Sequence, residues 1–406
     1  MAVFRAVMAG WTCLAAAAAE INPRGTPAGT NDYPVIPLRN LAGVAWEARP
    51  GFRDFSSMAI AGDAVVTGNT SGRGGTFAFD AATGKLLWRI PGQMKGEPAA
   101  AGDAVFSVND VGGDTFRLSA LARKSGKPLW SVAGVKLGQR NGPPLASGGS
   151  VWLLSDNGKA GRYDAATGKL LWEHAYSPGR GYCPTALSLA EGILYFGGGE
   201  EPGARSQGRF LWALDAATGK ELWRFAARPE TGSPGECVEA PAVAGGVVVT
   251  AAWNVLFALD AKTGALRWKQ EVRRMVGGRN RRRTLSEPVI AGGAVYSYSQ
   301  EGLLGWDLNT GNQVFEFPGN FPAEEHRNRM AAAGGILYFT ANVTEPGAAS
   351  SRYLNALDLK TRRILWSHRV NRPSGPGAEA DWRTRFFLPA GGAVYYENAM
   401  ILVKLH

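Results

Sequence analysis

The chain has 406 residues and a formal net charge of +10, and 54 of its residues are glycine. That length exceeds the roughly 100–200 residues of an ordinary compact domain, and the glycine content is nearly twice the ~7% average, which indicates many turns. No long helical period occurs, and no continuous apolar span occurs beyond the N-terminus, so the sequence offers no long-helix architecture and no transmembrane span.

The first 40 residues are predicted to be an export signal followed by an extended segment. Residues 1–19 combine one arginine, a mostly apolar stretch and an alanine-rich end before Glu20, which is typical of a secretory signal peptide. We therefore expect a periplasmic or secreted protein, although Cys13 lacks the preceding leucine and small residues of a lipoprotein signal. Residues 20–40 are rich in proline and glycine, so we expect an extended lead-in to the first strand.

One nine-residue phrase recurs through the rest of the chain. It reads "DAATGKLLW" at 80–88 and at 164–172, and "DAATGKELW" at 215–223. The aspartate and glycine are typical of a tight hairpin turn, and the tryptophan is expected to wedge between neighbouring blades. Gaps of 42, 42, 51, 45, 47 and 51 residues, the period of a propeller blade, separate the aromatic positions, which are Trp88, Trp130, Trp172, Trp223, Trp268, Phe315 and Trp366.

Three copies depart from the phrase. Ala122 replaces the turn aspartate of the second copy, Phe315 replaces the tryptophan of the sixth, and Arg362 occupies the glycine position of the seventh. A positive φ at Arg362 would cost on the order of 1 kcal/mol.

A second repeated pattern predicts the number of blades. Eight short turn signals between apolar runs indicate eight inner hairpins, at 61–63, 101–103, 147–149, 190–192, 244–246, 291–293, 333–335 and 390–392. Seven outer repeats leave one outermost strand missing, and residues 41–48 supply it because Trp46 lies 42 residues before Trp88. The predicted fold is therefore all-β. It is an eight-bladed propeller of four-stranded antiparallel blades over 41–406, closed where 400–406 and 41–48 share one blade.

The pattern A-x-D-x-x-T-G-x-x-x-W is present over Ala78–Trp88, Ala213–Trp223 and Ala258–Trp268. It closely resembles the tryptophan-docking repeat of the pyrroloquinoline quinone (PQQ)-type propellers, and the resemblance covers residues 41–406. It implies the fold and leaves the activity open. Quinoprotein alcohol and glucose dehydrogenases share the repeat with non-enzymatic relatives such as the outer-membrane assembly lipoprotein BamB.

The resemblance to the dehydrogenases also implies a cofactor set that this chain does not reproduce. Those enzymes typically stack PQQ between a tryptophan and a disulfide of adjacent cysteines, bind calcium, and use an aspartate base. This chain has no adjacent cysteine pair, no C-x-x-C-H haem site and no H-E-x-x-H or G-x-S-x-G motif. We therefore assign no catalytic or metal-binding residue, and PQQ with calcium stays an alternative. For Cys183 and Cys237, a cross-blade disulfide and two unlinked thiols both stay open.

Polar residues gather in the links that lead from one blade to the next, which a propeller brings to one face around its channel. Ligand candidates there are four arginines (Arg53, Arg140, Arg327 and Arg383), three glutamates (Glu97, Glu239 and Glu287) and Trp382 as a stacking platform. These residues would form a pocket for an anionic or polyhydroxylated ligand. The alternative is that they pair with one another in a wet funnel. The arginine-rich run at 273–283 is expected to be a solvated loop, with a patch for anionic partners as its alternative.

The favoured function is an exported, monomeric, non-catalytic binding or scaffolding module that contacts an envelope protein. A PQQ-dependent oxidoreductase is the second hypothesis, and a polysaccharide-binding accessory protein is the third. Export argues against nucleic acid as a partner.

Overall fold

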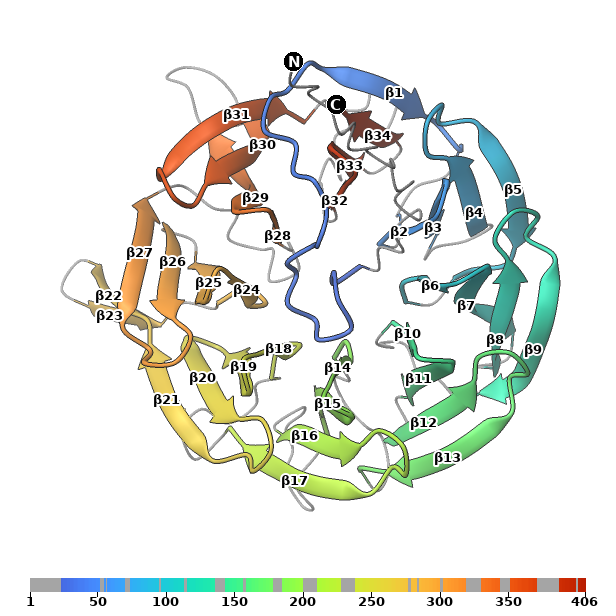
Figure 1. Ribbon diagram of the computed structural model, residues 1–406, viewed down its shortest axis with the longest axis horizontal. Coiled ribbons are helices and arrows are strands. Elements are labelled where there is room, and N and C mark those ends of the chain that lie inside the picture. The colour runs from blue at the N-terminus through green and yellow to red at the C-terminus, as the bar shows by residue number, and fades with distance from the viewer. Residues whose placement is uncertain are drawn as a thin grey trace, which may run out of the picture.

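The molecule is a closed ring of eight blades around a central channel (Figure 1). The structure, a computed structural model, describes residues 23–406 apart from 52–54, 56, 70–73, 95, 113–114, 136–142, 156–157, 178–184, 200–209, 228–237, 277–278, 283–284, 300–301, 319–329, 344–350, 371–386 and 399–400. Within these residues, no helix has the length and apolar character needed to cross a membrane.

Each blade is a four-stranded antiparallel sheet, and in blades 1 to 7 the strands run outward from the channel in sequence order. The strands of blades 1 to 4 are β2 (Ala59–Ala61), β3 (Ala64–Gly68), β4 (Gly75–Asp80) and β5 (Leu86–Pro91); β6 (Ala99–Ala101), β7 (Ala104–Gly112), β8 (Thr115–Ala122) and β9 (Pro128–Val135); β10 (Leu145–Ser147), β11 (Ser150–Ser155), β12 (Lys159–Asp164) and β13 (Leu170–Ala175); β14 (Ser188–Ala190), β15 (Ile193–Gly198), β16 (Phe210–Asp215) and β17 (Glu221–Ala226).

Blades 5 to 7 follow the same order, and a two-stranded hairpin stands between blades 5 and 6. Their strands are β18 (Ala242–Ala244), β19 (Val247–Ala252), β20 (Val255–Asp260) and β21 (Leu266–Glu271); β24 (Val289–Ala291), β25 (Ala294–Ser299), β26 (Gly302–Asp307) and β27 (Gln313–Pro318); β28 (Ala331–Ala333), β29 (Ile336–Val343), β30 (Ser351–Asp358) and β31 (Arg363–Arg369). The hairpin consists of β22 (Arg273–Val276) and β23 (Arg279–Arg282), so the arginine-rich run is a strand pair where the sequence predicted a loop.

Blade 8 closes the ring as the count of repeats predicted. It consists of β32 (Phe387–Ala390), β33 (Ala393–Asn398), β34 (Ile401–Leu405) and, from the other end of the chain, β1 (Val44–Ala48). Trp46 lies opposite Lys404 in the antiparallel pairing of β1 with β34. Figure 1 shows these two strands side by side at the top of the ring, near both chain ends. This pairing gives blade 8 its fourth strand and joins the two ends of the chain, which closes the ring.

The core lies between blades, and this follows from the burial pattern of the strands. The two middle strands of a blade are buried almost throughout, as in β3 and β19, whereas an outer strand such as β5 is mostly exposed and buries only its tryptophan, Trp88. A sheet that is covered on both faces reads as a continuous apolar run, because each face packs against a neighbouring blade.

The repeated phrase forms the outer turn of blades 1 to 7, as predicted. In blade 1, a carboxylate oxygen of Asp80 accepts hydrogen bonds from the backbone N–H of Ala82 and from both the backbone and the hydroxyl of Thr83, at 2.7–3.1 Å. The hydrogen bonds from Thr83 hold the pKa of Asp80 below its ordinary value. Gly84 takes a φ of 71°, which reverses the chain.

The tryptophans dock each blade onto the next one. Each indole N–H donates to a backbone carbonyl at 2.7–3.3 Å; the pairs are Trp46 with Ala81, Trp88 with Arg123, Trp130 with Ala165, Trp172 with Ala216, Trp223 with Ala261, Trp268 with Leu308 and Trp366 with Leu38. Six of the rings also lie over the turn glycine of the following blade, where an added Cβ would lie 2.5–2.7 Å from ring atoms. The glycine therefore provides both the positive φ and the space for the indole.

Two of the departures from the phrase meet in one contact. Phe315 of blade 6 faces the turn of blade 7, where Arg362 stands in place of glycine with a φ of 58°. The Arg362 guanidinium lies 5.5 Å from the Phe315 ring centroid and donates to the Val314 carbonyl at 2.9 Å. Where Arg362 adds a side chain at the glycine position of blade 7, the facing aromatic residue of blade 6 is therefore the smaller phenylalanine.

We expect Phe315→Trp alone to destabilise the protein, because the larger ring would overlap the Arg362 side chain. Overpacking of this kind costs about 1–3 kcal/mol. Adding Arg362→Gly should remove the overlap, so the two substitutions should be coupled by about 1–3 kcal/mol in favour of the double variant. Denaturant unfolding of the wild type, both single variants and the double variant measures the coupling. Additive effects would contradict it.

Candidate functional site

Buried hydroxyl groups fix the links that lead into the inner strands. The Thr250 hydroxyl on β19 donates to the Glu239 carbonyl at 2.7 Å, and the Ser297 hydroxyl on β25 donates to the Ser286 carbonyl at 3.0 Å. Both hydroxyl-bearing residues are fully buried. Because a buried carbonyl needs a partner, these bonds position the backbone immediately before β18 and β24.

Three of the predicted ligand residues lie in the described part of the chain, and the ring does not bring all three together. Glu239 and Glu287 precede the inner strands of blades 5 and 6, which are neighbours, and both are half-buried. Glu97 is buried and precedes β6, which lies across the channel from β18 and β24 (Figure 1).

The other predicted site residues lie outside the described residues. They are Arg53, Arg140, Arg327, Trp382 and Arg383, together with Cys183 and Cys237 of the disulfide hypothesis and the signal peptide at 1–19. Their roles stay predictions. The described residues contain no group of three or more His, Cys, Asp or Glu side chains that could hold a metal ion.

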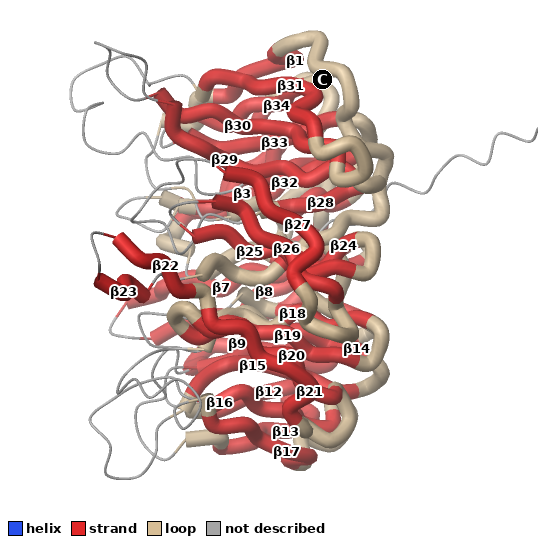
Figure 2. Tube along the Cα trace, turned by 90° about the vertical axis from the view of Figure 1, so that its left-hand side faces the viewer, coloured by secondary structure: helices blue, strands red, loops and turns tan. Residues whose placement is uncertain are grey.

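The structure places the predicted lead-in where the sequence did not indicate, inside the ring. The described lead-in residues, 23–40, run from β1 into the centre of the ring, as the blue trace in Figure 1 shows. Figure 2 shows the disk on edge, with the described turns along one face and the hairpin β22–β23 at the opposite face. We call residues 23–40 the plug.

The plug is held by the free edges of the inner strands. Four successive blades donate a backbone N–H to plug carbonyls at 2.7–2.9 Å: Leu189 to Pro27, Val243 to Ala28, Ile290 to Thr30 and Ala332 to Asn31. Blade 8 adds a bond from Gly392 to the Ile36 carbonyl at 2.9 Å. The innermost strand of a propeller blade otherwise has an unpaired edge. The plug forms main-chain hydrogen bonds with these edges, as an extended peptide does when it pairs with an exposed sheet edge.

Arg24 is the residue that anchors the plug in the channel. Its side chain donates to the Ser188 hydroxyl at 2.9 Å and to the Pro241 carbonyl at 2.8 Å, and it makes longer bonds to the carbonyls of Leu187, Gly29 and Ala240. Its Nε lies 3.8 Å from a carboxylate oxygen of Glu287, and the two side chains are only 6% and 14% exposed. Glu287, predicted to bind a ligand, is therefore ion-paired with the chain's own arginine.

The local sequence explains how the plug packs so closely. Gly29 has a φ of 64°, and a Cβ there would lie 2.4 Å from the Ser188 hydroxyl and 2.6 Å from the Arg24 guanidinium. Only glycine fits both the backbone conformation and the space. Burial raises the pKa of the neighbouring Asp32 carboxyl, which a hydrogen bond with the Tyr33 backbone partly offsets.

The plug also completes the docking pattern at blade 8. This blade lacks the turn that would receive Trp366, and the Leu38 carbonyl of the plug accepts the indole N–H instead. The Tyr338 hydroxyl accepts from the Leu38 N–H at 2.8 Å, and burial raises the pKa of that hydroxyl to about 12. The plug is thus part of the ring's closure as well as its central filling.

The three described glutamates of the predicted site do not form one cluster. Glu287 is engaged by Arg24, and Glu97 lies on the far side of the channel. These residues do not offer the carboxylate donor set that a bound PQQ with calcium would need. We call the face that carries the hairpin β22–β23, opposite the described turns in Figure 2, the link face; no role is assigned to it so far.

Comparisons with known proteins agree with this fold. The sequence profile of the family described as outer membrane protein assembly factor BamB matches residues 42–181 and 114–368. The chain is 23% identical to tetrathionate hydrolase of Acidithiobacillus ferrooxidans over 364 residues, which cover 80% of this chain and 67% of that protein. It is 26% identical to BamB of Burkholderia pseudomallei over 260 residues, which cover 61% of this chain and 60% of that protein.

The match to the quinoproteins has a higher sequence identity than the matches above, but it covers fewer residues. The chain is 34% identical to the dehydrogenase subunit of a quinone alcohol dehydrogenase from Gluconobacter oxydans over 150 residues, which cover 32% of this chain and only 19% of that subunit. Among solved structures, BamB from Moraxella catarrhalis superposes with a TM-score of 0.62 at 16% identity, covering 90% of this chain and 99% of that one. This structural likeness supports the fold alone.

Proposed function

Since the chain belongs to the family of PQQ-repeat propellers described as outer membrane protein assembly factor BamB, we propose that it is an exported binding module without catalysis of its own. In this proposal, the link face contacts a protein of the cell envelope. A periplasmic location is the setting that this role requires.

The observation that carries the proposal is the engagement of Glu287 by Arg24 in the channel. An acidic residue at the channel mouth is the group expected to hold a cation or to act as a base. Here its charge is paired with that of a buried arginine of the same chain, and the plug occupies the inner strand edges of four blades and contacts a turn of a fifth. The ring behaves as a preformed disk whose free surfaces are its face and rim, which suits a scaffold.

Crosslinking from the two faces tests the proposal. A photoreactive amino acid replaces Arg327, in the connection between β27 and β28, and in a matched protein it replaces Lys169, in the turn between β12 and β13 on the opposite face. Each full-length protein is illuminated in envelope extract of the host. We expect a defined protein adduct from position 327 and none from 169. Equal adducts from both positions, or none from 327, would overturn the link-face assignment.

A PQQ-dependent oxidoreductase is the second candidate, and the 34% identity to the quinone alcohol dehydrogenase subunit favours it. Titration of the purified chain with PQQ and calcium, followed by dye reduction with alcohols and sugars, separates the two candidates. We expect no saturable binding. Stoichiometric binding with turnover would replace the scaffold proposal by this second function.

A further inference from the structure

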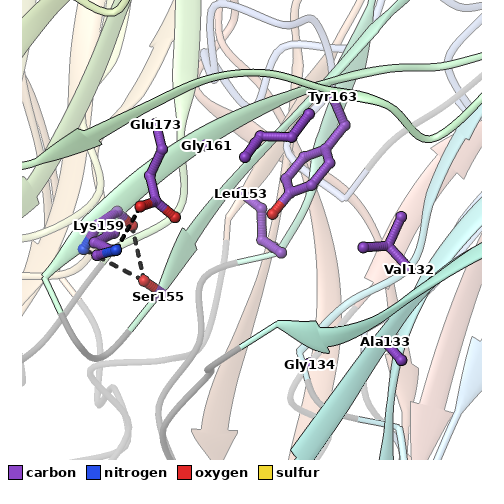
Figure 3. Close-up of a pocket in the computed structure, with 10 residues that line it drawn as sticks. Val132, Ala133, Gly134, Leu153, Ser155, Lys159, Gly161, Tyr163 and Glu173 are labelled. Atoms are coloured by element: carbon purple, nitrogen blue, oxygen red, sulfur yellow. Dashed lines mark hydrogen bonds and ion pairs between the residues drawn. The ribbon is translucent and has the colours of Figure 1, made fainter.

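A groove of about 510 Å³ opens between the outer strands of blades 2 and 3. Figure 3 shows Val132 and Ala133 of β9 on one side, and Leu153 and Tyr163 of blade 3 on the other. Glu173 of β13 and Lys159 of β12 lie at one end. This volume and the mixture of apolar walls with a few polar groups are usual for a small-molecule site. None of the residues that line the groove belongs to the plug.

The cause of the groove is a single glycine in the repeat. The residue three positions before the turn aspartate faces the preceding blade. In blade 5 this residue is Phe257, and its ring centroid lies 5.4 Å from that of Phe225 in blade 4. Blades 1 and 4 place Phe77 and Trp212 at this position, and blade 3 places Gly161 there. The groove therefore includes the place that an aromatic ring occupies in blades 1, 4 and 5, whereas blades 2, 6 and 7 carry Ser119, Leu304 and Asn355 at this position.

The residue that covers this ring is also changed. In blade 1 the Arg89 guanidinium lies 5.2 Å from the Phe77 ring centroid, and in blade 4 Arg224 lies 5.3 Å from that of Trp212. The strand pairing sets Glu173 opposite Gly161 in the same way. Blade 3 thus lacks the ring and carries the opposite charge beside the empty place.

The groove keeps polar groups available. The Tyr163 hydroxyl points into it (Figure 3) and has no hydrogen-bond partner among the described residues. Burial and the Glu173 charge raise the pKa of this hydroxyl. Glu173 pairs with Lys159, but both side chains are about 40% exposed, at 41% and 42%. An exposed ion pair of this kind contributes little to stability, so an incoming cation can take the place of Lys159 beside Glu173.

We propose that this groove binds an aromatic ring that carries a cationic group. The ring lies over Gly161 between Val132 and Leu153, the cation pairs with Glu173, and the Tyr163 hydroxyl is free to hydrogen-bond the ligand. The strand pairing places Glu173 directly opposite Gly161, whereas Lys159 lies two residues earlier on β12, so the negative charge is next to the ring position.

Binding of tryptamine to the purified full-length protein, measured by calorimetry against the anionic analogue indole-3-acetate, tests the proposal. We expect saturable tryptamine binding and at least about tenfold weaker binding of indole-3-acetate. The peptide acetyl-Lys-Trp-amide supplies the same chemistry from a polypeptide. Tighter binding of the peptide identifies a partner's side chain as the source, and tighter binding of tryptamine identifies a free amine. Binding of neither probe, or equal binding of the anionic analogue, would overturn the proposal.

Variants locate the site. Gly161→Phe should weaken tryptamine binding by at least about tenfold. Gly161 does not have a positive φ, and an added Cβ would meet the Tyr163 ring edge at 3.2 Å, which a small ring shift relieves. Glu173→Gln should abolish the preference for tryptamine, and Lys159→Ala should strengthen its binding by freeing Glu173.

Glu316→Gln is the matched control, because Glu316 takes the Glu173 position in blade 6 opposite Leu304, where the side chain is present. It should leave binding unchanged. If both Gly161→Phe and Glu173→Gln bound tryptamine as tightly as the wild type does, the ligand would lie elsewhere and the proposal would be refuted.

Discussion

Arg24→Ala is expected to lower the free energy of unfolding by about 3–5 kcal/mol, the usual effect of removing one partner of a buried ion pair. The substitution leaves the Glu287 carboxylate half-buried beside an empty space and removes the donors to the Ser188 hydroxyl and the Pro241 carbonyl. Denaturant unfolding measures the loss. Amide hydrogen exchange should also accelerate at Leu189, Val243 and Ile290, whose N–H groups donate to the plug.

Two further variants identify the cause of that loss. Arg24→Ala combined with Glu287→Gln should recover part of the stability, because a neutral amide is easier to leave without a charged partner than a carboxylate. Arg39→Ala is the control within the plug. Arg39 pairs with Asp358 at 3.2 Å but is 53% exposed, so its removal should change stability by less than about 1 kcal/mol. Equal losses from Arg24→Ala and Arg39→Ala would show that the channel anchor does not stabilise the ring.

The parts of the fold that the sequence predicted are those fixed by local chemistry. A hairpin turn needs its aspartate and glycine within a few residues, so every turn leaves the same short pattern, and the pattern repeats at each blade. Counting inner and outer hairpins then predicted the shared blade, and the pairing of Trp46 with Lys404 confirmed it.

The plug could not be predicted in this way. Its partners are inner strand edges that lie 160 to 300 residues away along the chain, and a backbone N–H at such an edge leaves no trace in the side-chain pattern. Arg24 looked like one more charge in a polar, glycine-rich lead-in. The contact between Phe315 and Arg362 was hidden for a related reason. Both departures are visible in the sequence, but only the ring shows that they face each other across one blade boundary.

The groove could be predicted from the sequence in part. Gly161 is visible as soon as blade 3 is aligned with its neighbours on the turn aspartate. Its significance depends on the direction in which the side chain of that position points, which comes from the contact of Phe225 with Phe257 in another pair of blades.

Trp268→Ala is expected to cost about 3–5 kcal/mol, the range for truncating a buried tryptophan. The Trp268 ring is 9% exposed, its N–H donates to the Leu308 carbonyl at 2.9 Å, and the ring lies over Gly311 of blade 6. Truncation therefore opens the boundary between blades 5 and 6. Denaturant unfolding gives the size of the effect, and faster hydrogen exchange in the turn at 307–312 shows where the ring has loosened.

Trp268→Phe separates packing from the hydrogen bond at this boundary. A phenyl ring keeps most of the apolar contact, so the loss should be nearer to the ~0.5–1.5 kcal/mol of one hydrogen bond. Leu266→Ala on the same strand removes a side chain that is 39% exposed, and it should change stability by no more than about 0.5 kcal/mol. If Trp268→Ala were no worse than Leu266→Ala, the tryptophans would mark the repeat without holding the blades together. A loss of several kcal/mol would instead show that stability is transmitted around the ring through these docking contacts, because each boundary has one principal aromatic anchor and closure requires all eight boundaries.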